Sequence, residues 1–146
     1  MLTAMAPHGQ ACELLLTAHR SGQELLRLPI NAASPELRIA FEHSVLGTTV
    51  IDRYVFSPHA RLIEERFSGV GYGLPSAAGP GERLERIGES EIWRLQLDRP
   101  VQPLVVRPLP ALRMRLLLDE GDLLLSKLSD VAIEIQAQGC AQPAPQ

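Results

Sequence analysis

The sequence predicts an all-β fold, either a β-sandwich or a partly open barrel, built from about ten short and mainly antiparallel strands. Short segments in which apolar and polar residues alternate recur along the chain, and this is the period of a half-buried strand. Turn residues such as Gly, Pro, Asp and Ser separate these segments. No long stretch has the 3.6-residue period of an amphipathic helix.

The expected strands follow one another as hairpins and short meanders. Pro103 and Pro108 interrupt one of them and confine it to the edge of a sheet, because proline cannot donate to a strand ladder. Residues 83–89 are expected to form one or two helical turns. The expected strands cover residues 12–19, 23–28, 37–45, 50–56, 62–74, 91–97, 101–109, 112–118, 123–128 and 131–138.

The clearest alternation lies in the strand expected over residues 91–97. Trp93, Leu95 and Leu97 fall on one face, and Arg94 and Gln96 fall on the other. We therefore expect Trp93 to lie in the core.

Length and composition indicate a single domain over residues 11–139, with tails at 1–10 and 140–146. The chain has 146 residues, of which 45% are hydrophobic, so disorder over most of its length is excluded. A net charge of -3 argues against nucleic acid as a partner. No apolar run reaches the roughly 18 residues of a transmembrane segment.

The segment from residue 41 to residue 54 reads as a hairpin whose register decides which side chains meet. With a two-residue loop at 46–47, His43 lies opposite Val50 and diagonal to Asp52. With a four-residue loop at 46–49, His43 lies directly opposite Asp52. A three-residue loop would move His43 to the other face, because a slip of one residue inverts every side chain.

This hairpin carries more polar groups than an ordinary turn needs. The favoured interpretation is that His43 and Asp52 form a polar pair, with Ser44 and Thr48 capping the turn through hydrogen bonds to the backbone. A carboxylate beside an imidazole can also tune a general base or orient a metal ligand, so these roles stay open.

A second pattern places glycines at every other position over residues 67–75. Gly69, Gly71 and Gly73 share one face of an extended segment, so a ring, a backbone or a ligand could approach that face closely. A barrel corner or bulge is the favoured interpretation. The spacing does not match a phosphate loop, since no Lys-Ser/Thr follows.

Together the two segments resemble an uncharacterised bacterial family, domain-of-unknown-function family 1850. The first family motif reads His-Ser-Val, a short gap, Thr-Pro-Val, an acidic residue and an aromatic, and the second reads Gly-Ala-Gly-Leu-Pro. Here Thr49 stands in place of Pro, Asp52 in place of Glu and Tyr72 in place of Ala. The matching residues are His43, Ser44, Val45, Thr48, Val50, Asp52, Tyr54, Phe67, Gly71, Gly73, Leu74 and Pro75.

The resemblance implies a setting and no assigned activity. Genes of that family tend to lie beside, or join, tripartite (TRAP) transporters of the TAXI class, which implies an accessory protein of the cell envelope. Its partner would then be a transporter component or a small solute. Residues 1–11 have neither a basic n-region nor an apolar h-region, which instead indicates a cytoplasmic chain as written.

From these observations we predict a non-enzymatic accessory or small-ligand-binding module with no cofactor and no assigned catalytic residue. The alternative is a hydrolase or metalloenzyme in which His43 is the base or ligand and Asp52 orients it. The expected binding residues are His43, Ser44, Thr48, Asp52, Tyr54, Gly71, Tyr72 and Gly73.

Cys12 and Cys140 lie near opposite ends of the expected domain, where terminal strands often meet. A disulfide is geometrically possible in an oxidising compartment, but two unpaired thiols are the favoured expectation.

Overall fold

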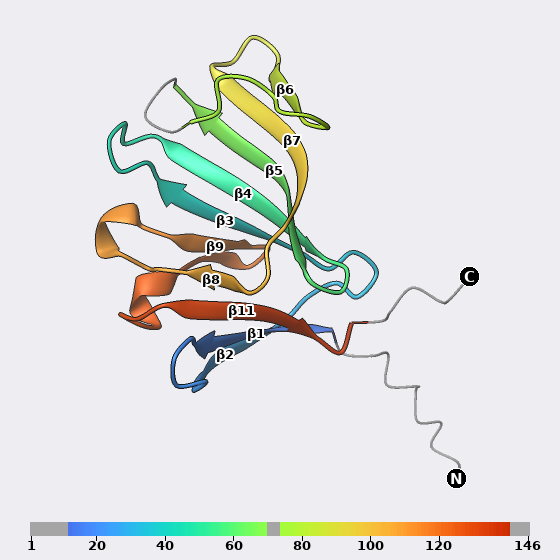
Figure 1. The fold of residues 1–146 in the computed structure, drawn as a ribbon. Helices are drawn as coiled ribbons and strands as arrows, with labels where there is room; N and C mark the ends of the chain where they lie inside the picture. The colour runs from blue at the N-terminus through green and yellow to red at the C-terminus, as the bar shows by residue number, and fades with distance from the viewer. Residues whose placement is uncertain (1–11, 70–73, 141–146) are drawn as a thin grey trace, which may run out of the picture.

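The computed structural model describes residues 12–69 and 74–140, and within these residues eleven strands form two open antiparallel sheets (Figure 1). This arrangement confirms the all-β prediction, and the molecule is a two-layer sandwich rather than a closed barrel. The two short 3-10 helices are η1 (Pro110–Leu112) and η2 (Leu125–Lys127). No helix among the described residues is long and apolar enough to cross a membrane.

The smaller sheet has four strands in the order β2-β1-β11-β8. In that order its strands are Glu24–Pro29, Glu13–Ala18, Ile133–Gln138 and Leu104–Val106. The larger sheet has seven strands in the order β10-β9-β3-β4-β5-β7-β6. In that order its strands are Gly121–Leu124, Arg115–Leu118, Glu36–Glu42, Thr49–Phe56, Ala60–Ser68, Ile92–Pro100 and Arg83–Arg86.

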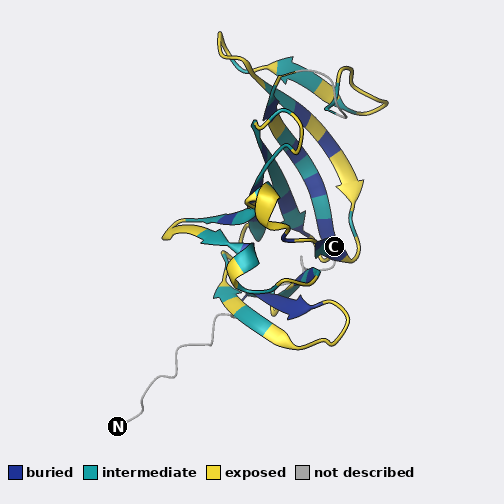
Figure 2. Ribbon diagram, turned by 90° about the vertical axis from the view of Figure 1, so that its left-hand side faces the viewer, coloured by how far each residue is buried: buried dark blue, intermediate teal, exposed yellow. Residues whose placement is uncertain are grey.

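The larger sheet curves, and the smaller sheet lies against the part of it that is built from the lower strands in Figure 1. β7 and β6 extend away from the smaller sheet (Figures 1 and 2). Figure 2 shows that buried residues form bands across the middle strands, whereas the turns are exposed. The inner face of the larger sheet is therefore only partly covered by the second layer.

One hydrophobic core joins the two sheets because each contributes the apolar face of its alternating strands. Leu14 and Leu16 of β1 and Ile133 and Ile135 of β11 come from the smaller sheet. The larger sheet supplies most of the remaining buried side chains, which are Leu37, Ile39, Val50, Tyr54, Phe56, Ala60, Leu62, Phe67, Leu95, Leu97 and Leu116.

The alternation in β7 places side chains as expected. Leu95 and Leu97 are buried in the core, and Gln96 is exposed on the other face. Trp93 also packs against the core but remains half-buried, because it lies near the start of β7 and pairs with Arg86 of the edge strand β6.

Several expected boundaries were wrong. Residues 83–86 form the strand β6 rather than a helical turn, because their backbone pairs with β7. Only Leu104–Val106 of the 101–109 segment is a strand, and it lies at a sheet edge as its prolines require. The strand expected over 123–128 ends at Leu124 and continues as η2.

The expectation of unpaired thiols was also wrong. Cys12 and Cys140 form a disulfide, with their Cα atoms 4.3 Å apart. The cause is the pairing of β1 with β11, in which Glu13 lies opposite Gln138 and brings the flanking residues to one place.

Candidate functional site

The β3–β4 turn comprises residues 44–47, which differs from each of the three loops expected from the sequence. Glu42 pairs with Thr49, and the backbone N–H of His43 donates to the carbonyl of Thr48 at 2.7 Å. The register places His43 opposite Thr48, so His43 and Asp52 lie on the same face of the sheet, as expected. Asp52 is four residues further along the strand than Thr48, however, which separates it from His43 by about 13 Å. Asp52 instead lies opposite Ile39.

The side chain of His43 caps its own turn. Its Nδ1 accepts hydrogen bonds from the backbone N–H groups of Val45 at 3.2 Å and Leu46 at 3.1 Å. A ring nitrogen that accepts two donors carries no proton, so this geometry requires the neutral imidazole with its proton on Nε2. The capping expected of Ser44 and Thr48 is performed by His43.

Ser44 and Thr48 take other positions. Ser44 is exposed at the turn, and the hydroxyl of Thr48 donates to the carbonyl of Ser68 at 3.2 Å. Thr48 therefore ties the β3–β4 turn to the end of β5. Gly71, Tyr72 and Gly73 lie outside the described residues.

Asp52 lies on the inner, apolar face of the larger sheet. It shares that face of β4 with the buried residues Val50 and Tyr54, and it lies opposite Ile39 of β3. On its other side Asp52 pairs directly with Glu65 of β5. The register therefore places two carboxyl groups side by side on a face that is otherwise mainly hydrophobic.

A β-bulge in β5 is the cause of the pairing between Asp52 and Glu65. Arg53 lies opposite Glu64 and Tyr54 lies opposite Leu62, so Ile63 is an extra residue that disrupts the ladder. Without it, the pairing at Tyr54 would continue to Asp52 opposite Glu64. The bulge therefore brings Glu65 rather than Glu64 onto the inner face.

Glu64 and Glu65 have contrasting surroundings as a result. Glu64 is buried on the outer face, where Arg66 lies 3.1 Å and Arg94 3.9 Å from its carboxylate. Glu65 is half-buried and has no ion pair with a cation in residues 12–69 or 74–140. One carboxylate is neutralised by arginines, and the other faces a second carboxyl group.

Burial is the largest cause that raises the pKa of Asp52 from its ordinary value of 3.8 to about 8. The negative charge of Glu65 and a hydrogen bond between the two carboxyl groups add to this effect. Two carboxyl groups bond to each other only when one is protonated, so this contact favours the protonated form of Asp52. The buried Asp52 Oδ1 has no hydrogen-bond partner in the described part of the chain.

The hydroxyl of Tyr54 completes the group. It donates to Asp52 Oδ2 over a long distance of 3.4 Å, and this bond opposes the rise in the pKa of Asp52. Burial, followed by the charge of Asp52, raises the pKa of Tyr54 in turn. We call Asp52, Tyr54 and Glu65 the inner-face acidic group.

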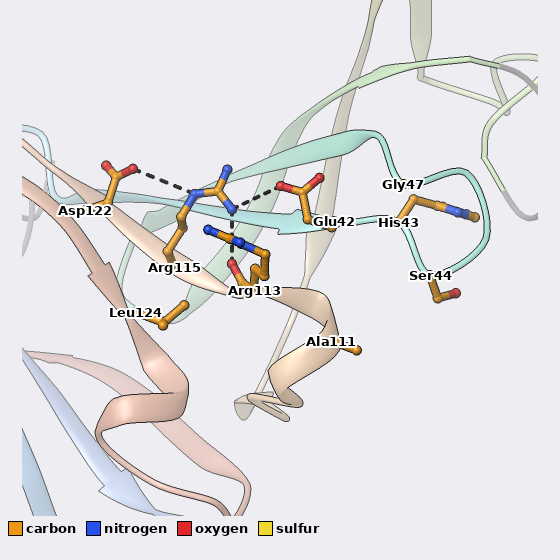
Figure 3. A pocket seen from close by; sticks show the side chains of 9 residues that line it. All are labelled: Glu42, His43, Ser44, Gly47, Ala111, Arg113, Arg115, Asp122 and Leu124. Carbon is orange, nitrogen blue, oxygen red and sulfur yellow. Dashed lines mark hydrogen bonds and ion pairs between the residues drawn. The ribbon is translucent and has the colours of Figure 1, made fainter.

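A separate surface hollow of about 740 Å³ adjoins the β3–β4 turn (Figure 3). In it, Arg115 lies 3.3 Å from a carboxylate oxygen of Glu42 and 3.7 Å from one of Asp122, so its charge is compensated. Figure 3 shows the His43 ring pointing away from this arginine and into its own turn. His43 and Ser44 line this hollow, whereas Thr48, Asp52 and Tyr54 do not.

The sequence analysis named Asp52 and Tyr54 as candidates and did not name Glu65. The signal for Glu65 was its position in a strand that follows β4 after a tight turn, but the bulge at Ile63 changes which carboxylate faces inward. Among residues 12–69 and 74–140, no group of three or more His, Cys, Asp or Glu side chains could hold a metal ion.

Comparison with known proteins gives one match. The family model described as a domain of unknown function, DUF1850, matches residues 37–125, which is more than half of the chain. The matched region spans β4–β10 and all but the first residue of β3, and it therefore includes the inner-face acidic group. Neither the curated proteins nor the solved structures give a match. The chain belongs to the DUF1850 family.

Proposed function

We propose that this protein is a non-enzymatic binding module that recognises a small solute through the inner-face acidic group. The recognised part of the solute is a cationic hydrogen-bond donor, such as an ammonium or guanidinium group. This proposal keeps Asp52 and Tyr54 from the sequence prediction and adds Glu65.

The observation that carries the proposal is a pair of adjacent carboxyl groups on an apolar face. Burying a carboxylate costs free energy unless donors compensate it. Here Tyr54 offers one long hydrogen bond, and Asp52 Oδ1 is buried without a donor among the described residues. A donor from a solute would gain most at such an oxygen, because it would replace a missing interaction.

The charge of the pair favours a cation. With its pKa raised to about 8, Asp52 keeps its proton at neutral pH, and Glu65 lies beside it. An approaching cation stabilises the doubly ionised pair, so the pKa of Asp52 falls and its proton is released. As whole residues, Asp52 and Glu65 are both half-buried.

The experiment measures binding of arginine and butylammonium by isothermal titration calorimetry, with succinate as the anionic comparison. We expect the two cations to bind, succinate not to bind, and up to one proton to be released per cation near pH 7. Asp52→Asn and Glu65→Gln should each abolish cation binding, whereas the exposed Asp130→Asn should not.

The outcomes separate the parts of the proposal. Binding of succinate alone would show that the ligand class is wrong. Cation binding that survives both Asp52→Asn and Glu65→Gln would show that the site lies elsewhere. A transporter component replaces the solute as the occupant if the intact protein binds such a component and Asp52→Asn weakens that binding.

The alternative of a hydrolase or metalloenzyme built on His43 and Asp52 has less support. His43 Nδ1 is occupied by the turn, and the register places Asp52 beside Glu65. A double-mutant cycle of His43→Ala with Asp52→Asn should show a coupling below about 0.5 kcal/mol, whereas Asp52→Asn with Glu65→Gln should show about 0.5 to 3 kcal/mol. Strong coupling of the first pair would revive the alternative.

A further inference from the structure

The smaller sheet is a layer built largely from the two ends of the described chain. β1 and β2 precede residue 36 and β11 follows residue 125, so β8 is the one strand of this layer that lies in the region matched by the family. β1 joins the β1–β2 hairpin to the layer through its ladder with β11. On its other side, β11 pairs with β8 at three positions.

The disulfide closes one end of the β1–β11 ladder. Its two sulfur-bearing residues differ in exposure, since Cys12 is 4% exposed and Cys140 is half-buried. Cys140 also lines a cavity of about 420 Å³ together with Ala33, Ser57 and Pro58. An external thiolate can therefore approach Cys140, whereas Cys12 is shielded.

We propose that the Cys12–Cys140 disulfide is a redox-sensitive clasp that holds the β1–β2 hairpin onto the rest of the molecule. A dithiol opens the clasp in two steps. The first thiolate attacks Sγ of Cys140, the S–S bond breaks, and Cys12 leaves as a thiolate that takes up a proton. The second thiol of the reductant then attacks the mixed disulfide, which releases Cys140 as a thiol and leaves the reductant oxidised.

The topology determines which part loosens after reduction. Residues 13–29 are held by the β1–β11 ladder, by the buried side chains of Leu14 and Leu16, and by the clasp. The β1–β2 hairpin as a unit is thus joined to the rest by one ladder, whereas each central strand of the larger sheet has a ladder on both sides. Opening should therefore begin in the smaller sheet, as the least supported unit.

The test compares amide hydrogen exchange of the purified protein with and without dithiothreitol, with thiols counted by mass after N-ethylmaleimide treatment. We expect two alkylated thiols after reduction and exchange that is faster by about tenfold or more in residues 13–29 and 133–138. Exchange in β4 and β5 should change by less than about twofold.

A Cys12→Ser/Cys140→Ser variant is the matched control. It should exchange like the reduced protein and should not respond to dithiothreitol. Equal acceleration in both sheets would overturn the proposal, because the disulfide would then add only global stability. Unchanged exchange, or thiols that dithiothreitol does not expose, would also overturn it, and the wild-type series distinguishes these outcomes even if the variant does not fold.

Discussion

Asp52 is the residue whose surroundings differ most from those its side chain prefers. Its neighbours across the sheet are Ile39 and Glu65, and its neighbours along β4 are Val50 and Tyr54. The apolar neighbours remove water from the carboxyl group, and Glu65 adds a like charge. Both effects favour the protonated form of Asp52, so folding changes the pKa of this residue.

The stability of the protein should depend on pH through Asp52. Between the ordinary pKa of 3.8 and the folded value of about 8, the folded chain keeps a proton that the unfolded chain has lost. This contribution therefore makes the free energy of unfolding fall as pH rises across this window, and it levels off above about pH 8. Urea unfolding at about pH 5, 7 and 9 should show a flatter dependence for Asp52→Asn than for the wild type. The control Asp130→Asn should keep the wild-type slope, and an unchanged slope in Asp52→Asn would contradict the assignment.

Trp93 should contribute to stability despite its partial exposure. Its ring packs against the core from the inner face of β7. We expect Trp93→Ala to lower the free energy of unfolding by about 3 kcal/mol, the low end of the range for large aromatic side chains, because the site is only half-buried. Gln96→Ala, on the exposed face of the same strand, should change it by less than about 0.5 kcal/mol. Equal effects of the two changes in urea unfolding would show that the ring is not part of the core.

At the scale of elements, the β3–β4 turn depends on the left-handed backbone of Gly47, whose φ is 67°. An added Cβ would meet no atom within 4 Å, so the cost of a substitution comes from the backbone alone. Gly47→Ala should therefore lower the free energy of unfolding by about 1 kcal/mol.

Gly47→Asn is the matched variant for this turn, because asparagine adopts left-handed backbone more readily than alanine does. Its loss of stability in thermal unfolding should be the smaller of the two. An asparagine variant as unstable as the alanine variant would indicate that the side chain, rather than φ, determines the cost.

The sequence predicted the elements better than their registers. Alternation predicted most strands. It also predicted that His43 and Asp52 lie on one face of the hairpin, because successive side chains of a strand point to opposite faces. The loop of residues 44–47 could not be read from propensity, since it depends on the ring of His43 bonding back to the turn. The pairing of Asp52 with Glu65 depends on a bulge at Ile63, and nothing in the apolar pattern distinguishes an extra residue from an ordinary one.

At the scale of the whole molecule, both sheets are open, so each leaves two edge strands. The edge strand β8 has only three residues, and Pro103 and Pro108 lie close to its ends. Both features oppose pairing of β8 with a strand of another chain. β6 carries Arg83, Glu85 and Arg86 among its four residues. Charged side chains on an edge oppose pairing with a second chain.

Removing the charges of β6 should therefore promote association. We expect Arg83→Val/Arg86→Val to form larger species with rising concentration, as measured by static light scattering. Arg20→Val/Lys127→Val changes the net charge equally at exposed positions outside the strands and should remain like the wild type. Association of both variants would point to net charge rather than to the edge.

The disulfide also shapes the chain when no fold is present. Cys12 and Cys140 are 128 positions apart, so the oxidised polypeptide stays a nearly complete ring after urea has removed both sheets. A ring occupies less volume than the same chain with free ends and exposes less surface to the denaturant. The oxidised protein should therefore unfold with a smaller dependence of free energy on urea concentration than the reduced protein, and its denatured form should elute later from a sizing column.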